Sequence, residues 1–127
     1  MKKVFILILL ALFLTGCKNV LDQALDKTAD AILEADTIRK KLGANEDLAK
    51  ADCVKVCESE VAVGNDLSSG PCLVNPFAGL TDWVCDVAHN PRQAVDNEPK
   101  NQCSAYRAGK ATHFVEVDES CNIINVQ

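Results

Sequence analysis

The sequence predicts an α-rich α+β fold: an N-terminal helical hairpin followed by a small disulfide-stapled region with short helices and a C-terminal β-hairpin. A heptad-like apolar repeat over residues 20–42 predicts the first helix. Apolar and polar residues alternate over residues 113–117 and 123–126, and the turn-forming segment 118–122 separates them. Aromatic residues make up only 5% of the chain, so the core is small and depends on cysteine cross-links.

The N-terminus carries three features in a fixed order. Lys2 and Lys3 form a short basic segment, and the uninterrupted apolar stretch Val4–Leu14 follows it. The stretch is too short for a membrane-spanning helix, which needs ~20 apolar residues. It ends at the motif Leu14-Thr15-Gly16-Cys17. This order resembles the type II signal peptide, with its lipobox, of the bacterial lipoprotein class.

The resemblance implies that residues 1–16 are removed as a signal peptide and that Cys17 becomes the first mature residue. Cys17 would carry a thioether-linked diacylglycerol and often an N-acyl group such as palmitate, so residues 17–19 form a lipidated N-terminus that anchors the protein to a membrane. The alternative is an ordinary secretory signal that leaves Cys17 as a thiol.

The same resemblance implies a location in the cell envelope. Because Lys18 rather than aspartate follows the cysteine, the protein would sit on the outer membrane facing the periplasm if the cell has two membranes. In a cell with one membrane it would sit on the outer face of the cytoplasmic membrane. The major outer-membrane lipoprotein family also places a heptad helix after its lipidated cysteine. This chain ends at Gln127 without the terminal lysine used for wall attachment, so wall linkage is not implied.

The predicted hairpin covers residues 20–63. Its first helix has an apolar seam with alternating spacings of three and four, and Gly43 suits its C-terminal end. The seam consists of Leu21, Ala24, Thr28, Ala31, Ala35, Ile38 and Leu42. Asn45 is a plausible N-cap for the second helix, which packs back on the first and ends at Gly64.

The rest of the chain divides into a loop connector and a cystine-rich α+β region. Residues 64–80 are rich in Gly, Pro, Ser and Asn, which predicts the connector. In the region 81–127, a short helix over residues 82–88 would bury Trp83, and Asn90-Pro91 would open a helical turn that runs to Val95. Trp83 is interpreted as a core residue, with an exposed binding anchor as the alternative.

Six cysteines follow the lipidated one, and we predict that they form three disulfides, because an exported domain with a sparse core uses such cross-links. The cysteines are Cys53, Cys57, Cys72, Cys85, Cys103 and Cys121. Cys53 and Cys57 lie four apart on a helix, too far for a mutual bridge, so both would clamp the helix to the C-terminal region. The other pairings stay open. A zinc site and a thiol-redox site at Cys53 and Cys57 are the alternatives.

The charge balance bears on partners. The chain has 18 acidic and 13 basic residues, a net charge of −5, and removal of the signal would take Lys2 and Lys3 away. This excess of acids argues against nucleic acid as a partner and against polybasic docking on anionic lipids. One side of the first helix carries an acidic row that is a candidate face for a basic protein or a cation, or simply a solvated face: Asp22, Asp26, Asp30 and Glu34.

No catalytic residue, metal site or cofactor is assigned from the sequence. His89 and Arg92 lie near Asp86 and Asp96, a grouping that could serve acid–base work or anion capture. A metal site at His113 is disfavoured, because on a strand His113 points to the face opposite Glu116 and Asp118.

Three hypotheses of function follow, and the oligomeric state is left open. The first is a lipid-anchored, extracytoplasmic binding or structural module that is not an enzyme. The second is an acidic inhibitor lipoprotein that captures a basic protein on the acidic row. The third is a small enzyme centred on His89 and Arg92.

Overall fold

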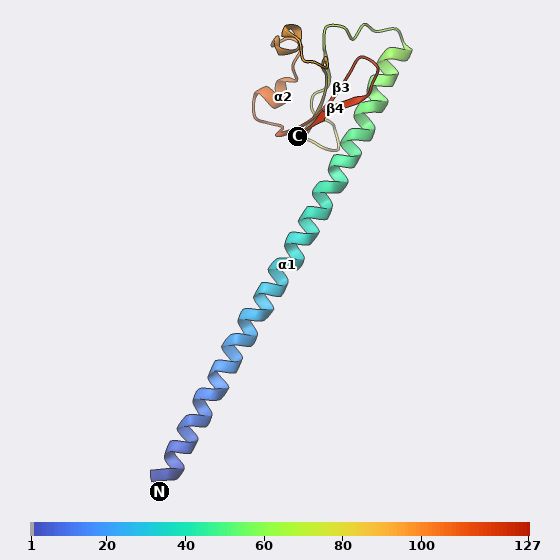
Figure 1. Cartoon of the computed structure of the whole chain (residues 1–127). Helices are drawn as coiled ribbons and strands as arrows, with labels where there is room; N and C mark the ends of the chain where they lie inside the picture. Colours follow the sequence, from blue (N-terminus) through green and yellow to red (C-terminus); the bar gives the residue numbers. More distant parts are fainter. Residues whose placement is uncertain (1) are drawn as a thin grey trace. The chain divides into compact units, whose positions relative to one another are not determined.

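The structure is a computed structural model that describes the backbone of residues 2–127 and the side chains of residues 23–127. Its elements are α1 (Lys2–Ala62), β1 (Cys72–Val74), β2 (Trp83–Val87), the 3-10 helix η1 (Ala94–Asn97), α2 (Ser104–Arg107), β3 (His113–Val117) and β4 (Ile123–Val126) (Figure 1). The fold is mixed α+β. The chain divides into two compact units, Met1–Leu42 and Gly43–Gln127. The side chains of Cys17 and Asp22 lie outside the described residues.

The predicted helical hairpin is not confirmed, because α1 continues through Gly43 without a turn. A glycine inside a helix costs about 1 kcal/mol relative to alanine, which the strong helix formers around Gly43 can offset. Residues 43–62 therefore continue α1 instead of forming a second helix. The described residues contain only two α-helices, so the α-rich description is not confirmed either.

Within the described side chains, the apolar seam predicted in the first helix is exposed. Ile38 and Leu42 of the seam have exposed fractions of 53% and 55%, and Leu25 and Ile32 beside it have 59% and 69%. The second helix that would have covered them is absent from the part of the chain that the structure describes. Within that part, no helix is both long enough and apolar enough to cross a membrane.

The four strands form one sheet in the order β1-β2-β3-β4. β1 is antiparallel to β2, β2 is parallel to β3, and β3 is antiparallel to β4. β3 and β4 occupy the ranges predicted for the C-terminal β-hairpin. In the parallel pair, Val84 lies beside Phe114 and Asp86 lies beside Glu116.

The helix predicted over residues 82–88 is wrong, because this segment forms β2. All five of its residues are buried, so both faces of the strand are covered. A strand buried on both faces shows no apolar–polar alternation and cannot be told from a buried helix by periodicity. The predicted loop connector also contains the short strand β1, and the helical turn expected to open at Pro91 lies instead at η1, Ala94–Asn97.

The main core lies between the C-terminal part of α1 and one face of the sheet. Ala49, Cys53 and Cys57 of α1 are fully buried and belong to the same apolar cluster as Val115 and Val117 of β3. Trp83 belongs to this cluster too, with 6% of its surface exposed. This agrees with the interpretation of Trp83 as a core residue.

The predicted disulfides are present, and the structure decides their pairing. Cys53 is bonded to Cys85, Cys57 to Cys121, and Cys72 to Cys103. The first two attach α1 to β2 and to the turn before β4. The third links the edge strand β1 to the residue that precedes α2.

Candidate functional site

The two faces of the sheet have different neighbours. Side chains alternate between faces along a strand, so Cys85 and Val115 face α1 while Val84, Asp86 and Glu116 lie on the opposite face. The connection from β2 to β3, residues 88–112, carries η1 and α2. Ala105 of α2 packs against Val84 in a second apolar cluster, which places α2 over the face turned away from α1.

A pocket of about 530 Å³ lies on this second face, and we call it the sheet-face pocket. Its floor comes from β2, β3 and β4. Its walls come from the connection between β2 and β3, which contributes Arg92, Asn97, Gln102, Cys103, Tyr106 and Arg107. The volume falls within the range of small-molecule sites, roughly 300–1,000 Å³.

The floor of the sheet-face pocket has an apolar row and a polar row. Val84 and Phe114 are neighbours in the sheet, and the Tyr106 ring meets the Phe114 ring edge-on with centroids 5.1 Å apart. The polar row lies two residues further along the strands. It runs across the sheet through Asp86, Glu116 and Asn125. A ligand here would meet aromatic surface on one side and hydrogen-bonding groups on the other.

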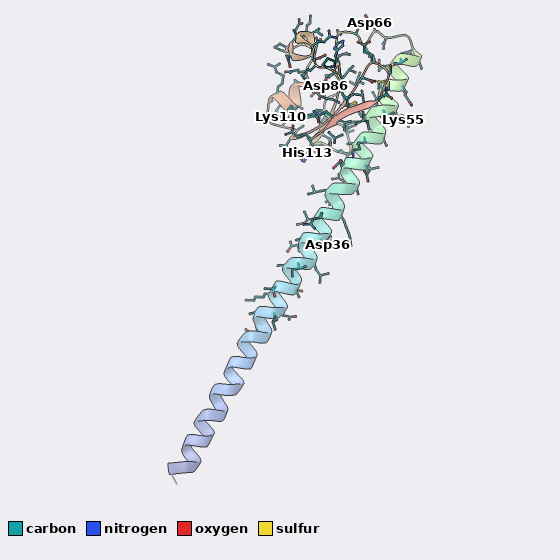
Figure 2. All side chains as sticks on the ribbon, viewed as in Figure 1. Asp36, Lys55, Asp66, Asp86, Lys110 and His113 are labelled. Carbon is teal, nitrogen blue, oxygen red and sulfur yellow. A yellow bond between two sulfur atoms is a disulfide. The ribbon has the colours of Figure 1, made fainter. Side chains whose placement is uncertain are left out.

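Asp86 is the polar residue of the site that has a buried atom without a hydrogen bond. Only 8% of its surface is exposed, and its Oδ1 atom is buried without a hydrogen-bond partner. Burial, followed by the nearby Glu116 carboxylate, raises the pKa of Asp86 to about 7, although the Arg92 guanidinium pulls it down in part. Near neutral pH the side chain therefore carries its proton about half of the time. Asp86 is labelled in Figure 2.

Glu116 and Arg92 form an ion pair at the edge of the pocket. Glu116 also accepts a hydrogen bond from Asn125 Nδ2 at 3.1 Å, and Arg92 Nε donates one to Asn97 Oδ1 at 3.0 Å. The bond to Glu116 raises the pKa of Arg92. Because each charge has its partner, this pair gives the polar row no net charge.

His89 and Asp96 form a second cluster beside the pocket. His89 Nδ1 lies 2.7 Å from Asp96 Oδ1, and His89 Nε2 lies 3.0 Å from Glu119 Oε1. Asp96 also accepts hydrogen bonds from the backbone N–H groups of Gln93 and His89. The bond to Asp96 raises the pKa of His89. Burial opposes ionisation of Asp96, but the hydrogen bonds outweigh it and the pKa of Asp96 is lowered.

The structure thus divides the residues that the sequence grouped between the pocket and an adjoining cluster, and Arg92 joins the two because its Nη2 donates to the Asp96 carbonyl oxygen at 3.4 Å. Arg92 and Asp86 line the sheet-face pocket, whereas His89 and Asp96 are not among its lining residues. His89 helps to position the segment that carries Arg92, because Asp96 of η1 contacts His89 and also accepts a hydrogen bond from the backbone N–H of Gln93, the N-cap of η1. The separation weakens the grouping as a single catalytic centre.

The other sequence candidates lie in separate places. Asp26, Asp30 and Glu34 are exposed on α1. His113 contacts Asp82. Asp118 Oδ1 accepts hydrogen bonds from backbone N–H groups of the turn before β4. The sulfur atoms of Cys53 and Cys57, considered for zinc or thiol chemistry, are each bonded to another cysteine. These candidates do not converge on one site.

Sequence reasoning missed Tyr106, Asn125 and the pairing of Asp86 with Glu116. The alternation over residues 113–117 does place Phe114 and Glu116 on one strand face, which is the local signal that could have identified half of the floor. Nothing local shows that β2 lies beside β3, because residues 88–112 separate the two strands.

Comparisons with known proteins find no protein family, no curated protein and no solved structure that matches this chain. The function is therefore argued from the residues and from the geometry of the site.

Proposed function

We propose that this protein is a lipid-anchored extracytoplasmic lipoprotein whose residues 43–127 act as a ligand-binding domain. The order of the basic segment, the apolar stretch and the motif ending at Cys17 supports lipid anchoring. The three disulfides support export, because such bonds form and persist in oxidising compartments outside the cytoplasm.

The buried, unpartnered oxygen of Asp86 in the sheet-face pocket is the observation that carries the binding role. A buried polar atom without a hydrogen bond costs about 1–3 kcal/mol, which a ligand that bonds to Asp86 would recover. Strand pairing holds the floor of the pocket and the Cys72–Cys103 disulfide anchors one of its lining residues, so binding would require little ordering of the chain.

The ligand we expect is small, uncharged overall and amphipathic. Glu116 and Arg92 neutralise one another, and below pH 7 Asp86 is protonated and can both donate and accept a hydrogen bond. Tyr106 and Phe114 offer aromatic surface to an apolar part of the ligand.

Binding is favoured over catalysis because the charged groups are engaged with each other. The Arg92 guanidinium bonds to Glu116, and His89 is shared between Asp96 and Glu119. A general base needs a lone pair within hydrogen-bond reach of the substrate, and these contacts engage His89 and Glu116, so Asp86 is the one carboxyl group lining the pocket that is not held in an ion pair.

Ligand-observed NMR on the full chain in detergent micelles tests the binding role. The probes are methyl glycosides and N-acylated amino acid amides, which are uncharged and amphipathic. We expect at least one class to bind, and Tyr106→Ala to weaken that binding about tenfold through lost aromatic contact. The exposed Asp47→Asn is the matched control. Binding that Tyr106→Ala leaves unchanged would argue against the pocket.

The intact mass of the protein purified from bacterial membranes tests the anchor. We expect cleavage before Cys17, a diacylglyceryl adduct on that residue, and six alkylated cysteines only after reduction. Cys17→Ser should abolish the adduct and release the protein from the membrane fraction, because the acyl chains supply the anchoring energy. An unlipidated wild-type mass in the membrane fraction would contradict the anchor.

A further inference from the structure

The disulfide Cys72–Cys103 lies against the buried carboxyl group of the sheet-face pocket. Cys103 lines the pocket, and one carboxylate oxygen of Asp86 and the Sγ atoms of Cys72 and Cys103 all lie within 4.8 Å of one another. Because the two sulfur atoms are bonded to each other, they do not form a thiolate set for a metal ion in this state.

We propose that Cys72–Cys103 is a thiol-reducible, proton-coupled disulfide, with a small external thiol as reductant and Asp86 as the proton donor to the leaving Cys103 sulfur. The proposal concerns the redox chemistry of the domain and does not depend on the ligand proposed above.

The three disulfides differ in burial. Cys53, Cys57 and Cys85 have no exposed surface, and Cys121 has 8% of its surface exposed. Cys72 is only partly buried and belongs to β1, the edge strand of the sheet. A thiolate must reach a sulfur atom to attack a disulfide. Cys72 is the more exposed residue of the pair, so we assign its sulfur as the one attacked and Cys103, with 2% exposed, as the leaving group.

The exchange has two steps and consumes two external thiols. An external thiolate forms a bond to Cys72 Sγ, the Cys72–Cys103 bond breaks, and Cys103 leaves as a thiolate. The Asp86 carboxylic acid gives its proton to Cys103 and becomes a carboxylate. A second external thiolate attacks the external sulfur of the mixed disulfide, which releases Cys72 and an external disulfide. Two external thiols are oxidised, the two cysteines are reduced, and Cys72 and Asp86 regain protons from solvent.

The surroundings of Cys103 suit the reduced form. Its Sγ atom lies 3.3 Å from the carbonyl oxygen of Cys85 and 3.5 Å from that of Val74. A disulfide sulfur has no hydrogen to donate, whereas a Cys103 thiol could donate its S–H to either carbonyl. The buried thiol would therefore be satisfied without rearrangement of the strands.

The protonation of Asp86 sets the pH range of the step. Glu116 on β3 and Asp96 in η1 oppose its ionisation, Arg92 favours it, and Arg107 of α2 lines the same pocket. Burial is the largest influence, and the pKa of Asp86 is about 7. Below this pH the donor carries its proton, and above it the proton is lost.

Limited reduction of the full chain in detergent micelles tests the proposal. Dithiothreitol is the probe, between about pH 5 and about pH 9, and quenching by alkylation followed by peptide mass mapping identifies the opened disulfide. We expect Cys72 and Cys103 to be alkylated at least about tenfold faster than the other four cysteines, which act as internal controls. The rate per dithiothreitol thiolate should fall about tenfold per pH unit above pH 7.

Two variants distinguish proton donation by Asp86 from a difference in how accessible the disulfides are to the reductant. Asp86→Asn should remove the decrease in reduction rate above pH 7, because an amide has no acidic proton to lose. Glu116→Gln should move the fall to lower pH, since it removes a negative charge that opposes ionisation of Asp86. Asp47→Asn is the control and should leave the profile unchanged. Simultaneous opening of all three disulfides, or a flat wild-type profile, would overturn the proposal.

Discussion

Two buried aspartates near the pocket show how contacts decide the charge of a side chain. Asp96 is almost fully buried, with 1% exposed, yet its oxygens accept hydrogen bonds from His89 and Gln93 and its pKa is lowered. Asp86 has 8% exposed, but one oxygen has no partner and its pKa is raised to about 7. Burial and the nearby Glu116 carboxylate raise the pKa of Asp86, whereas hydrogen bonds to the Asp96 carboxylate outweigh its burial.

Asp86→Asn should stabilise the protein in a pH-dependent way. The pKa of Asp86 is about 7 when folded and 3.8 in its unperturbed state. Between these values the folded protein holds a proton that the unfolded chain releases, so stability falls as pH rises from about 4 to about 7. The variant should gain about 3 to 4 kcal/mol at pH 8 and little at pH 4.

Denaturant unfolding at the two pH values, with the disulfides intact, measures this gain. Asp47→Asn on the exposed side of α1 is the control. An equal gain at both pH values would contradict the assignment, because it would show that the benefit does not come from ionisation.

Gly70→Ala should destabilise the domain more than Gly109→Ala. Both glycines have φ of +66°, so either alanine is strained in the left-handed region. A Cβ atom on Gly70 would also lie 2.5 Å from Asp96 Oδ1 and 3.1 Å from the Val87 carbonyl oxygen, whereas one on Gly109 meets nothing within 4 Å. We expect losses of about 3 and about 1 kcal/mol. Equal losses in thermal unfolding would show that the Asp96 contact is not rigid.

The elements that the sequence predicted correctly are those whose patterns are local. β4 alternates exposed and half-buried residues, and the turn at Asp118–Asn122 separates it from β3. β2 was predicted as a helix because both its faces are covered, by α1 on one side and by the segment containing α2 on the other. Covering by distant segments leaves no periodic signal within the strand itself.

Gly43→Ala tests the continuity of α1. A Cβ atom at Gly43 meets nothing within 4 Å, and alanine is favoured over glycine inside a helix by about 1 kcal/mol. We expect helical content, measured by circular dichroism, to stay level or rise. At Gly64, where φ is +83° after the end of α1, alanine should instead lower stability by about 1 kcal/mol. A loss of helix in Gly43→Ala would support the hairpin turn.

At the scale of the whole molecule, all three disulfides lie in residues 43–127. They join positions separated by 32, 64 and 31 residues, and they tie residues 43–62 of α1 to the sheet and to the residue before α2. The domain has few large core side chains, and the largest fully buried apolar ones are valines. Its stability therefore depends strongly on the cross-links.

Removal of Cys57–Cys121 by double substitution to alanine should cost about 4 kcal/mol, because this bond closes the longest loop. Removal of Cys72–Cys103 should cost slightly less, about 3.7 kcal/mol by the same loop-entropy relation. Calorimetric unfolding of the two variants measures the difference. Full reduction of the wild type should lower Tm further than either variant, and a Tm insensitive to reductant would contradict the role of the cross-links.

The sequence by itself determined the lipoprotein-like N-terminus as an expectation, the use of cysteines as cross-links, and the positions of β3 and β4. Each follows from residues that are close together in the chain or from a simple count. The tertiary structure decided the disulfide pairing, the continuity of α1 and the pocket. These depend on which distant segments meet: Asp86 has its raised pKa only because β2 lies beside β3, where burial and Glu116 oppose its charge.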